Sequence, residues 1–362
     1  MAQADSRCRE RVGSDGVGGP PSGAAMAAVA RGEKLALVCL KLARGQLAES
    51  IGFYTGTLQF QLLSDGPVVR TEESADGPPC RVARQRLALT QASPSFALNS
   101  AGIELVSLVG ADGGDGGGSE GGDSVADFTP YEPPRDDVFW KIGLALHDLD
   151  ASVTRLATLG APGCAEVQGR QFLDIGYLVH VTDPAGFTVE LLQTTFEGSA
   201  ARRAALAAAS RGGAWEASPL AQDNDVVMGQ ITTRITNEAA SLEFYQQVLG
   251  MKLLAEEPVP DYNFRLFFLA YTDEEPPNAE DLEAVENREW LYQRPYTTLE
   301  LQLVASGPLR SVGPKEGGLE GIVVQLAECS PVRQRLKGRL KSIGGREFLE
   351  DPDGLRIFVE KL

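Results

Sequence analysis

Closely spaced cysteines, long apolar runs and clusters of basic residues are all missing from this 362-residue sequence. The five cysteines include no Cys-x-x-Cys pair, which excludes a zinc ribbon and a redox dithiol and fits a reducing compartment inside the cell. Without a run of about 18 apolar residues, no membrane-spanning helix is expected. The net charge of −17 and the lack of Lys and Arg clusters argue against nucleic acids and anionic membranes as partners.

The first 33 residues also lack the compact apolar core of a secretory signal. Their Gly, Ala, Ser and Arg content is that of a weak organellar presequence, but Asp5, Glu10 and Asp15 argue against one. We therefore predict a disordered tail over residues 1–33 and a cytoplasmic protein, with organellar targeting as the alternative.

What the sequence does contain is a regular alternation of strands and helices. Apolar and polar residues alternate over 230–235, which predicts a strand with its polar residues on one face. A helix follows, capped by Thr236 or Asn237 and ended by Gly250. The next strand then begins, so the layout is strand, helix, Gly, strand.

This layout recurs along the chain, and we predict four units of one plan, two in each half. A length of 362 residues at 43% apolar content is sufficient for two domains with separate cores. The last unit is predicted to be truncated by about one strand. The predicted boundaries are 34–198 for the first half with units 34–110 and 138–196, 199–225 for a helical linker, and 226–362 for the second half with units 227–305 and 319–362.

Four motifs carry a resemblance to a known family. They are Phe-Tyr-x-x-Val-Leu-Gly-Met over 244–251, Asn-Phe-Arg-Leu-Phe-Phe-Leu-Ala-Tyr over 263–271, Thr-Leu-Glu-Leu over 298–301 and Asp-Pro-Asp-Gly over 351–354. As an ordered set they resemble the vicinal oxygen chelate superfamily and, within it, the glyoxalase I (lactoylglutathione lyase) family. The resemblance implies an α+β fold of tandem βαβββ modules, whose two paired-module halves form curved mixed sheets.

The resemblance also implies a metal site shared between units. Carried over position by position, Gln230 and Glu300 of the third unit and Glu190 of the second are the implied ligands, while Lys141 stands where the family has His. The implied cofactor is a divalent metal (Zn, Ni or Co). A protonated Lys is not a metal ligand, however, and would instead neutralise the carboxylates as an internal ion pair without any metal. Both interpretations are open at this point.

A second site is implied between the first and fourth units. There Cys39 and Glu104 face Gly321 and Phe358, so one carboxylate remains. We expect this site to be inactive unless Glu360, two residues further on the same strand face, reaches into it.

If the first site is active, the resemblance implies a lactoylglutathione lyase-type enzyme. Its substrate would be the hemithioacetal of a thiol such as glutathione with a 2-oxoaldehyde such as methylglyoxal, converted through an enediolate. Glu190 is the expected base, Glu300 returns the proton, and Arg234 pairs with a glutathione carboxylate. Asp137 and Val304 replace two further glutathione-binding residues. The alternative is a catalytically inactive binding or scaffold protein with a degenerate metal site.

The two histidines, His147 and His180, fall outside the implied ligand positions. Ring-cleaving relatives hold iron with two His and one Glu, so that branch is disfavoured. Because fused halves supply what two subunits otherwise would, a monomer is expected.

Overall fold

The computed structural model describes residues 33–362, except 65, 75–76, 90–99, 110–126, 134–135, 159, 161–163, 165–166, 199–225, 306 and 314. The predicted tail, apart from Glu33, and the predicted linker helix lie outside the described residues.

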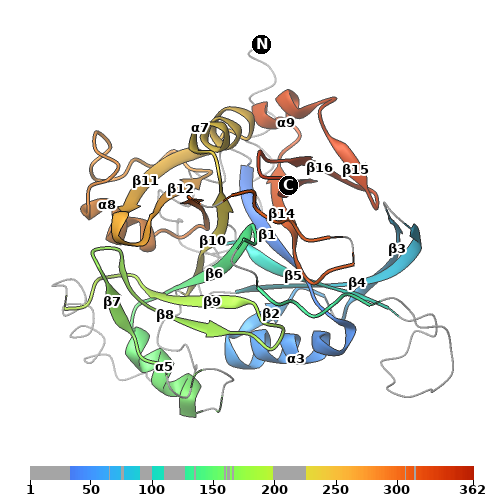
Figure 1. The fold of residues 1–362 in the computed structure, drawn as a ribbon, viewed down its shortest axis with the longest axis horizontal. Helices are drawn as coiled ribbons and strands as arrows, with labels where there is room; N and C mark the ends of the chain where they lie inside the picture. The colour runs from blue at the N-terminus through green and yellow to red at the C-terminus, as the bar shows by residue number, and fades with distance from the viewer. Residues whose placement is uncertain are drawn as a thin grey trace, which may run out of the picture.

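The first sheet joins the beginning and the end of the described chain (Figure 1). Its strand order is β15-β16-β17-β14-β1-β5-β4-β2, with β3 paired to β4. The strands are β1 (Glu33–Lys41), β2 (Phe60–Leu62), β3 (Val68–Ser74), β4 (Gly77–Leu89), β5 (Gly102–Leu108), β14 (Gly318–Leu326), β15 (Lys341–Ile343), β16 (Arg346–Glu350) and β17 (Arg356–Lys361).

The second sheet is built from the middle of the chain, in the order β11-β12-β13-β10-β6-β9-β8-β7. Its strands are β6 (Phe139–Leu146), β7 (Arg170–Phe172), β8 (Gly176–Thr182), β9 (Thr188–Gln193), β10 (Val227–Ile235), β11 (Lys252–Val259), β12 (Phe264–Ala270) and β13 (Thr298–Val304).

Antiparallel pairing of central strands joins the two halves of the chain in both sheets. β1 pairs with β14, and β6 pairs with β10, whereas β1–β5, β6–β9, β10–β13 and β14–β17 are parallel. Each sheet therefore combines one segment from before residues 199–225 with one from after them. The predicted fold class, curved mixed sheets with few helices, is confirmed.

Short helices lie at the periphery of the molecule, with α7 and α9 at the top, α3 and α5 at the bottom and α8 at the left of Figure 1. The helices are α3 (Leu47–Gly52), α5 (Leu149–Thr158), α7 (Glu238–Leu242), α8 (Glu286–Tyr292) and α9 (Pro331–Leu336), with π-helical turns at Phe53–Thr57 and Glu243–Val248 and 3₁₀ turns at Arg44–Gln46 and Pro260–Tyr262. In the part of the chain that is described, none of the helices has the length and apolar character needed to cross a membrane.

The predicted start and end of the helical segment after β10 are confirmed. The Asn237 side chain accepts a hydrogen bond from the backbone N–H of Ala240 at 3.1 Å, which satisfies one of the free donors of the first turn. Gly250 has a φ of 76°, a left-handed conformation that ends the helix without a Cβ clash.

Two equivalent tyrosine–aspartate bonds connect the sheets. Tyr54, which follows α3, donates to Asp183 at 3.0 Å, and Tyr245, which follows α7, donates to Asp351 at 2.8 Å. All four side chains are buried, and each aspartate also holds its own turn through backbone N–H groups. Because Asp183 precedes β9 of the second sheet and Asp351 precedes β17 of the first, these bonds hold the sheets together.

One predicted feature is wrong: the last segment is not short of a strand. β15 (Lys341–Ile343) pairs with β16 and gives this segment four strands, as many as residues 139–193 supply. Gly344 and Gly345, with φ of 56° and 75°, form the turn of this hairpin, and a three-residue strand leaves little alternation to detect. The division into four repeated units stays a prediction.

Candidate functional site

The structure brings together the four residues predicted for the first metal site, on one face of the second sheet that we call the inner face. Lys141 Nζ lies 2.8 Å from Glu190 Oε1 and 3.2 Å from Glu300 Oε2. Gln230 Nε2 donates to Glu190 Oε1 at 2.6 Å. Gly143 leaves the space for Gln230, because a Cβ there would lie 2.4 Å from Gln230 Cγ. We call these four side chains the Lys141 site.

The Lys141 site is buried, and its ionic groups control one another. Burial alone would lower the pKa of Lys141, but Glu190 and Glu300 outweigh it, so the pKa is raised. Burial likewise opposes ionisation of Glu190, yet Lys141 and His180 hold the pKa of Glu190 down at about 2. Burial raises the pKa of Glu300. Glu300 has a 3.2 Å contact to Lys141, longer than that of Glu190, and accepts a hydrogen bond from the Thr232 hydroxyl at 2.8 Å. Lys141 is therefore an ammonium ion bound chiefly to Glu190.

His180 belongs to this site, although the sequence analysis placed it outside. Its Nε2 lies 3.0 Å from Glu190 Oε2, because β8 and β9 pair His180 with Glu190 across the Asp183–Gly186 turn. Counting residues outward from both sides of that turn in the sequence would have predicted that His180 pairs with Glu190. His147 lies at the end of β6, 2.9 Å from the Thr194 hydroxyl, and is separate from the site.

Glu257 is a second residue that the sequence analysis missed. It is 0% exposed on β11, and pairing through Leu266 and Gln302 places it on the inner face with Glu300. The Tyr292 hydroxyl of α8 lies 3.1 Å from Glu257 Oε1. Burial raises the pKa of Glu257 to about 8, although Arg288 opposes the rise. The sequence has no alternation of apolar and polar residues here that would show that Glu257, and not its neighbour Glu256, is buried.

Arg234 lies on β10 and belongs to the row of paired residues that runs across the sheet from Glu257 through Leu266 and Gln302. Its guanidinium donates to the backbone carbonyls of Asp137 and Phe139 at 2.8 and 3.1 Å and to Gln302 at 3.2 Å. The Trp140 ring lies 5.6 Å from Arg234 Cζ and 4.8 Å from Lys141 Nζ. Arg234 thus has no carboxylate partner among the hydrogen bonds described, and it is partly exposed.

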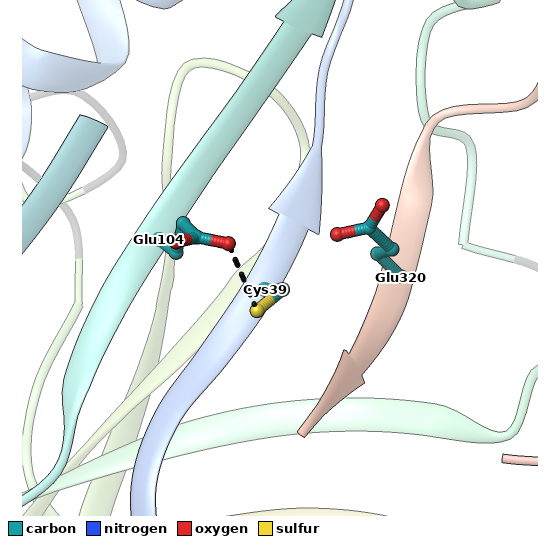
Figure 2. Close-up of side chains that lie close together, drawn as sticks. All are labelled: Cys39, Glu104 and Glu320. Carbon is teal, nitrogen blue, oxygen red and sulfur yellow. Dashed lines mark hydrogen bonds between the residues drawn. The ribbon is translucent and has the colours of Figure 1, made fainter. Parts of the chain in front are cut away.

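The second predicted site is filled by arginines of the protein itself. Figure 2 shows Cys39, Glu104 and Glu320 turned toward one another from neighbouring strands, and their ligand atoms lie within 4.8 Å. Arg84 lies 2.8 Å from Glu104 and 2.7 Å from Glu320, and Arg346 lies 3.0 Å from Glu104. Burial opposes ionisation of Glu104, but these guanidinium groups hold its pKa at about 2.

The remaining predicted members of this second site take structural roles. Glu360 does reach in, but to Arg86 at 2.7 Å and Arg346 at 3.5 Å. The Phe358 ring lies 4.0 Å from the guanidinium carbon of Arg346. Gly321 has no room for a side chain, since a Cβ would lie 2.5 Å from the Arg356 carbonyl oxygen.

A divalent metal does not fit either site as the side chains are arranged. In the second sheet the ammonium of Lys141 already lies between the two carboxylates, and it has no lone pair to offer a metal. The Cys39–Glu104–Glu320 group is the only set of three Cys, His, Asp or Glu side chains found close enough to share a metal among the described residues, and guanidinium cations surround it. In both sites, cations of the protein itself lie where a metal would bind.

Comparisons with known proteins agree with the fold. Residues 36–191 match the family model of the Glyoxalase/Bleomycin resistance protein/Dioxygenase superfamily. A lactoylglutathione lyase of Neisseria meningitidis serogroup A is 31% identical over 137 residues, which cover 35% of this chain and 86% of that protein. One from Oryza sativa subsp. japonica is 41% identical over 46 residues, but the match spans 16% of its length and 13% of this chain.

Among solved structures, glyoxalase I from Zea mays superposes with a TM-score of 0.53 at 16% identity, over 91% of this chain and 92% of the maize chain. At that level of identity the likeness concerns the fold alone.

Proposed function

Because the chain belongs to the Glyoxalase/Bleomycin resistance protein/Dioxygenase superfamily, we propose that it is a small-molecule binding protein that uses internal cations in place of metals. The observation that carries this proposal is the position of Lys141 Nζ, 2.8 Å from Glu190 and 3.2 Å from Glu300. An ammonium ion held by two buried carboxylates is costly to displace, because removing it leaves both charges unpaired.

The ligand that suits the exposed end of the inner face carries a carboxylate. Arg234 is partly exposed, it is hydrogen-bonded to neutral groups, and Trp140 beside it offers a flat apolar surface. A glutathione-type carboxylate fits this chemistry.

Metal analysis and an activity assay test the first part of the proposal. Protein purified from metal-supplemented medium should contain substoichiometric metal and should form no thioester from methylglyoxal and glutathione above the uncatalysed rate. One tightly bound metal per chain together with thioester formation would overturn the proposal.

Calorimetric titration with glutathione tests the binding site itself. Arg234→Met should weaken binding about tenfold or more, because a hydrogen bond to a charged group contributes about 1.5–3 kcal/mol. The exposed Arg310, which pairs with Glu316 at 2.7 Å, provides the control variant Arg310→Met, which should bind as the wild type does. Equal affinity of the Arg234 variant and the wild type would remove Arg234 from the site.

A second candidate function is the lactoylglutathione lyase reaction, favoured by one observation. Glu300 Oε1 is buried and has no hydrogen-bond partner among the described residues, so this carboxylate has a free acceptor atom beside Gln230 and Glu190. In this interpretation Glu190 accepts the proton and Glu300 returns it. Lys141→His then supplies a fourth ligand, so the affinity for Zn, Ni or Co should rise and thioester formation should appear or rise. A Lys141→His protein that still binds no metal would exclude this candidate.

A further inference from the structure

We propose that Glu257 and Glu300 form a binding site for the ammonium group of a small organic amine, beneath helix α8. The inference extends the proposed binding function by naming a second chemical group of the ligand, at the edge strand β11, three strands away from Arg234 on the same face.

The first argument is that both carboxylates have acceptor atoms without partners. Glu257 Oε2 and Glu300 Oε1 are buried and make no hydrogen bond within the described part of the chain. Their residues are 0% and 1% exposed. A buried acceptor left without a donor costs about 1–3 kcal/mol, so a ligand that brings N–H donors to these oxygens recovers that free energy.

The second argument is strand geometry. Glu257 pairs with Leu266 on β12, Leu266 pairs with Gln302 on β13, and Glu300 is two residues from Gln302. The two carboxylates therefore point to the same side of the sheet from β11 and β13. They are also close enough for the charge of Glu300 to contribute to raising the pKa of Glu257.

The third argument is charge. Three carboxylates, Glu190, Glu257 and Glu300, face two buried cations, Lys141 and Arg288, whose Nε lies 3.8 Å from Glu257. Arg288 also pairs with Asp174 at 2.8 Å, so above the pKa of Glu257, which burial raises to about 8, these two cations do not balance all the carboxylates. A bound ammonium ion adds positive charge in a region where water does not screen the charges.

Apolar side chains of the sheet surround the two carboxylates, and helix α8 covers them. Apolar side chains of the same face, including Leu178, Leu192 and Phe268, form one buried cluster with Tyr292 of α8. α8 is fastened over them by Arg288, which lies 2.8 Å from Asp174, and by Tyr292, which donates to the Ile175 carbonyl at 2.7 Å. An amine with a compact apolar body matches this combination.

Binding of benzylammonium and of benzyl alcohol, which has the same ring but no charge, tests the proposal by calorimetry at pH 8.5, above the pKa of about 8 of Glu257, and at fixed ionic strength. Wild-type protein should bind benzylammonium at least tenfold more tightly than benzyl alcohol. Glu257→Gln should lose that preference while keeping its shape, and Glu256→Gln, a neighbouring residue paired with Arg265, should retain it.

Equal affinity of the wild type for both probes, or no binding of either, would overturn the proposal without the need for any variant. So would a Glu257→Gln protein with the wild-type preference, provided its circular dichroism spectrum is unchanged. These outcomes are separate from the metal and glutathione measurements, because a protein that passes those tests can still fail this one.

Discussion

At the scale of single residues, Lys141 determines what the site in the second sheet can do. Its ammonium takes the central position between Glu190 and Glu300 and is itself 3% exposed. A buried charge of this kind is stable because its partners are equally buried, and removing one partner exposes the others to the full cost of an unpaired charge. The site therefore depends on Lys141 for its stability.

Replacing Lys141 by Met should lower the free energy of unfolding by about 3–5 kcal/mol in metal-free buffer, because it leaves buried carboxylates without a cation. Urea unfolding at pH 7 measures the change. The control is Lys361→Met, which removes an ion pair to Glu328. Both side chains of this pair are exposed to solvent, so this variant should be nearly as stable as the wild type. A Lys141→Met protein as stable as the wild type would show that Lys141 does not hold the two carboxylates.

Sequence reasoning could bring Gln230, Glu190, Glu300 and Lys141 together because family motifs and strand order locate all four. It could not choose between a metal ligand and an ion pair at Lys141, since that depends on where one flexible side chain lies. His180 and Glu257 were missed for another reason. The position of each depends on how its strand pairs with the neighbouring strand. The register of that pairing cannot be read from the sequence of one strand alone.

At the scale of secondary-structure elements, β14 shows why the second site cannot be restored by a single substitution. Gly321 lies where the family pattern requires a ligand, yet the Arg356 backbone and the Phe358 ring fill the space that a side chain would need. Glu320, the residue before it, pairs instead with Arg84 at 2.7 Å. The strand thus contributes an anion to an ionic network, and its glycine allows close packing.

Gly321→Ala should lower the free energy of unfolding by about 1–3 kcal/mol, because the added methyl group would overpack a rigid backbone contact. Thermal unfolding followed by circular dichroism measures it. Gly52 in α3, which has no atom within 4 Å of a Cβ, is the matched control, and Gly52→Ala should be neutral or stabilising by about 0.5–1 kcal/mol. If both variants had the same melting temperature, the packing argument for β14 would be wrong.

Elements with a clear periodicity were predictable, and elements that depend on tertiary contacts were not. The alternation over 230–235 and the cap at Asn237 predicted β10 and α7 correctly. β15 was missed because three residues carry no pattern, and it exists through its pairing with β16. α8 was missed as well, since its acidic sequence resembles a solvated loop although Asn287 and Arg288 are buried.

At the scale of the whole molecule, the two tyrosine–aspartate bonds make the joining of the sheets sensitive to pH. Burial raises the pKa of Asp183 and of Asp351 from 3.8 to about 6. Between these values the folded state retains protons that the unfolded chain has released. Folding stability should therefore decrease as the pH rises from about 4 to 6 on account of these two groups.

Asp183→Asn removes one of these titrating groups and keeps one acceptor oxygen for the backbone N–H groups of the turn, while its amide nitrogen takes the place of the oxygen that accepts from Tyr54. Its free energy of unfolding should fall less than that of the wild type between pH 4 and pH 7, by roughly 1–3 kcal/mol. The lowered pKa values of other carboxylates, such as Glu104 and Glu190, make folding stability rise with pH. The pH dependence of the variant is therefore compared with that of the wild type. Asp261→Asn at an exposed position should reproduce the wild-type profile. An Asp183 variant with that same profile would contradict the assignment.

The pairing of β1 with β14 also governs the order in which the molecule can assemble. β1 leaves the ribosome well before its antiparallel partner β14, which begins only at Gly318. Until that partner is synthesised, β1 has an open, apolar edge, and strand edges of this kind recruit other chains. Contacts so distant in sequence also form slowly, because a long loop must close first. The second sheet can form earlier, so the nascent protein should depend on chaperones until β14 emerges.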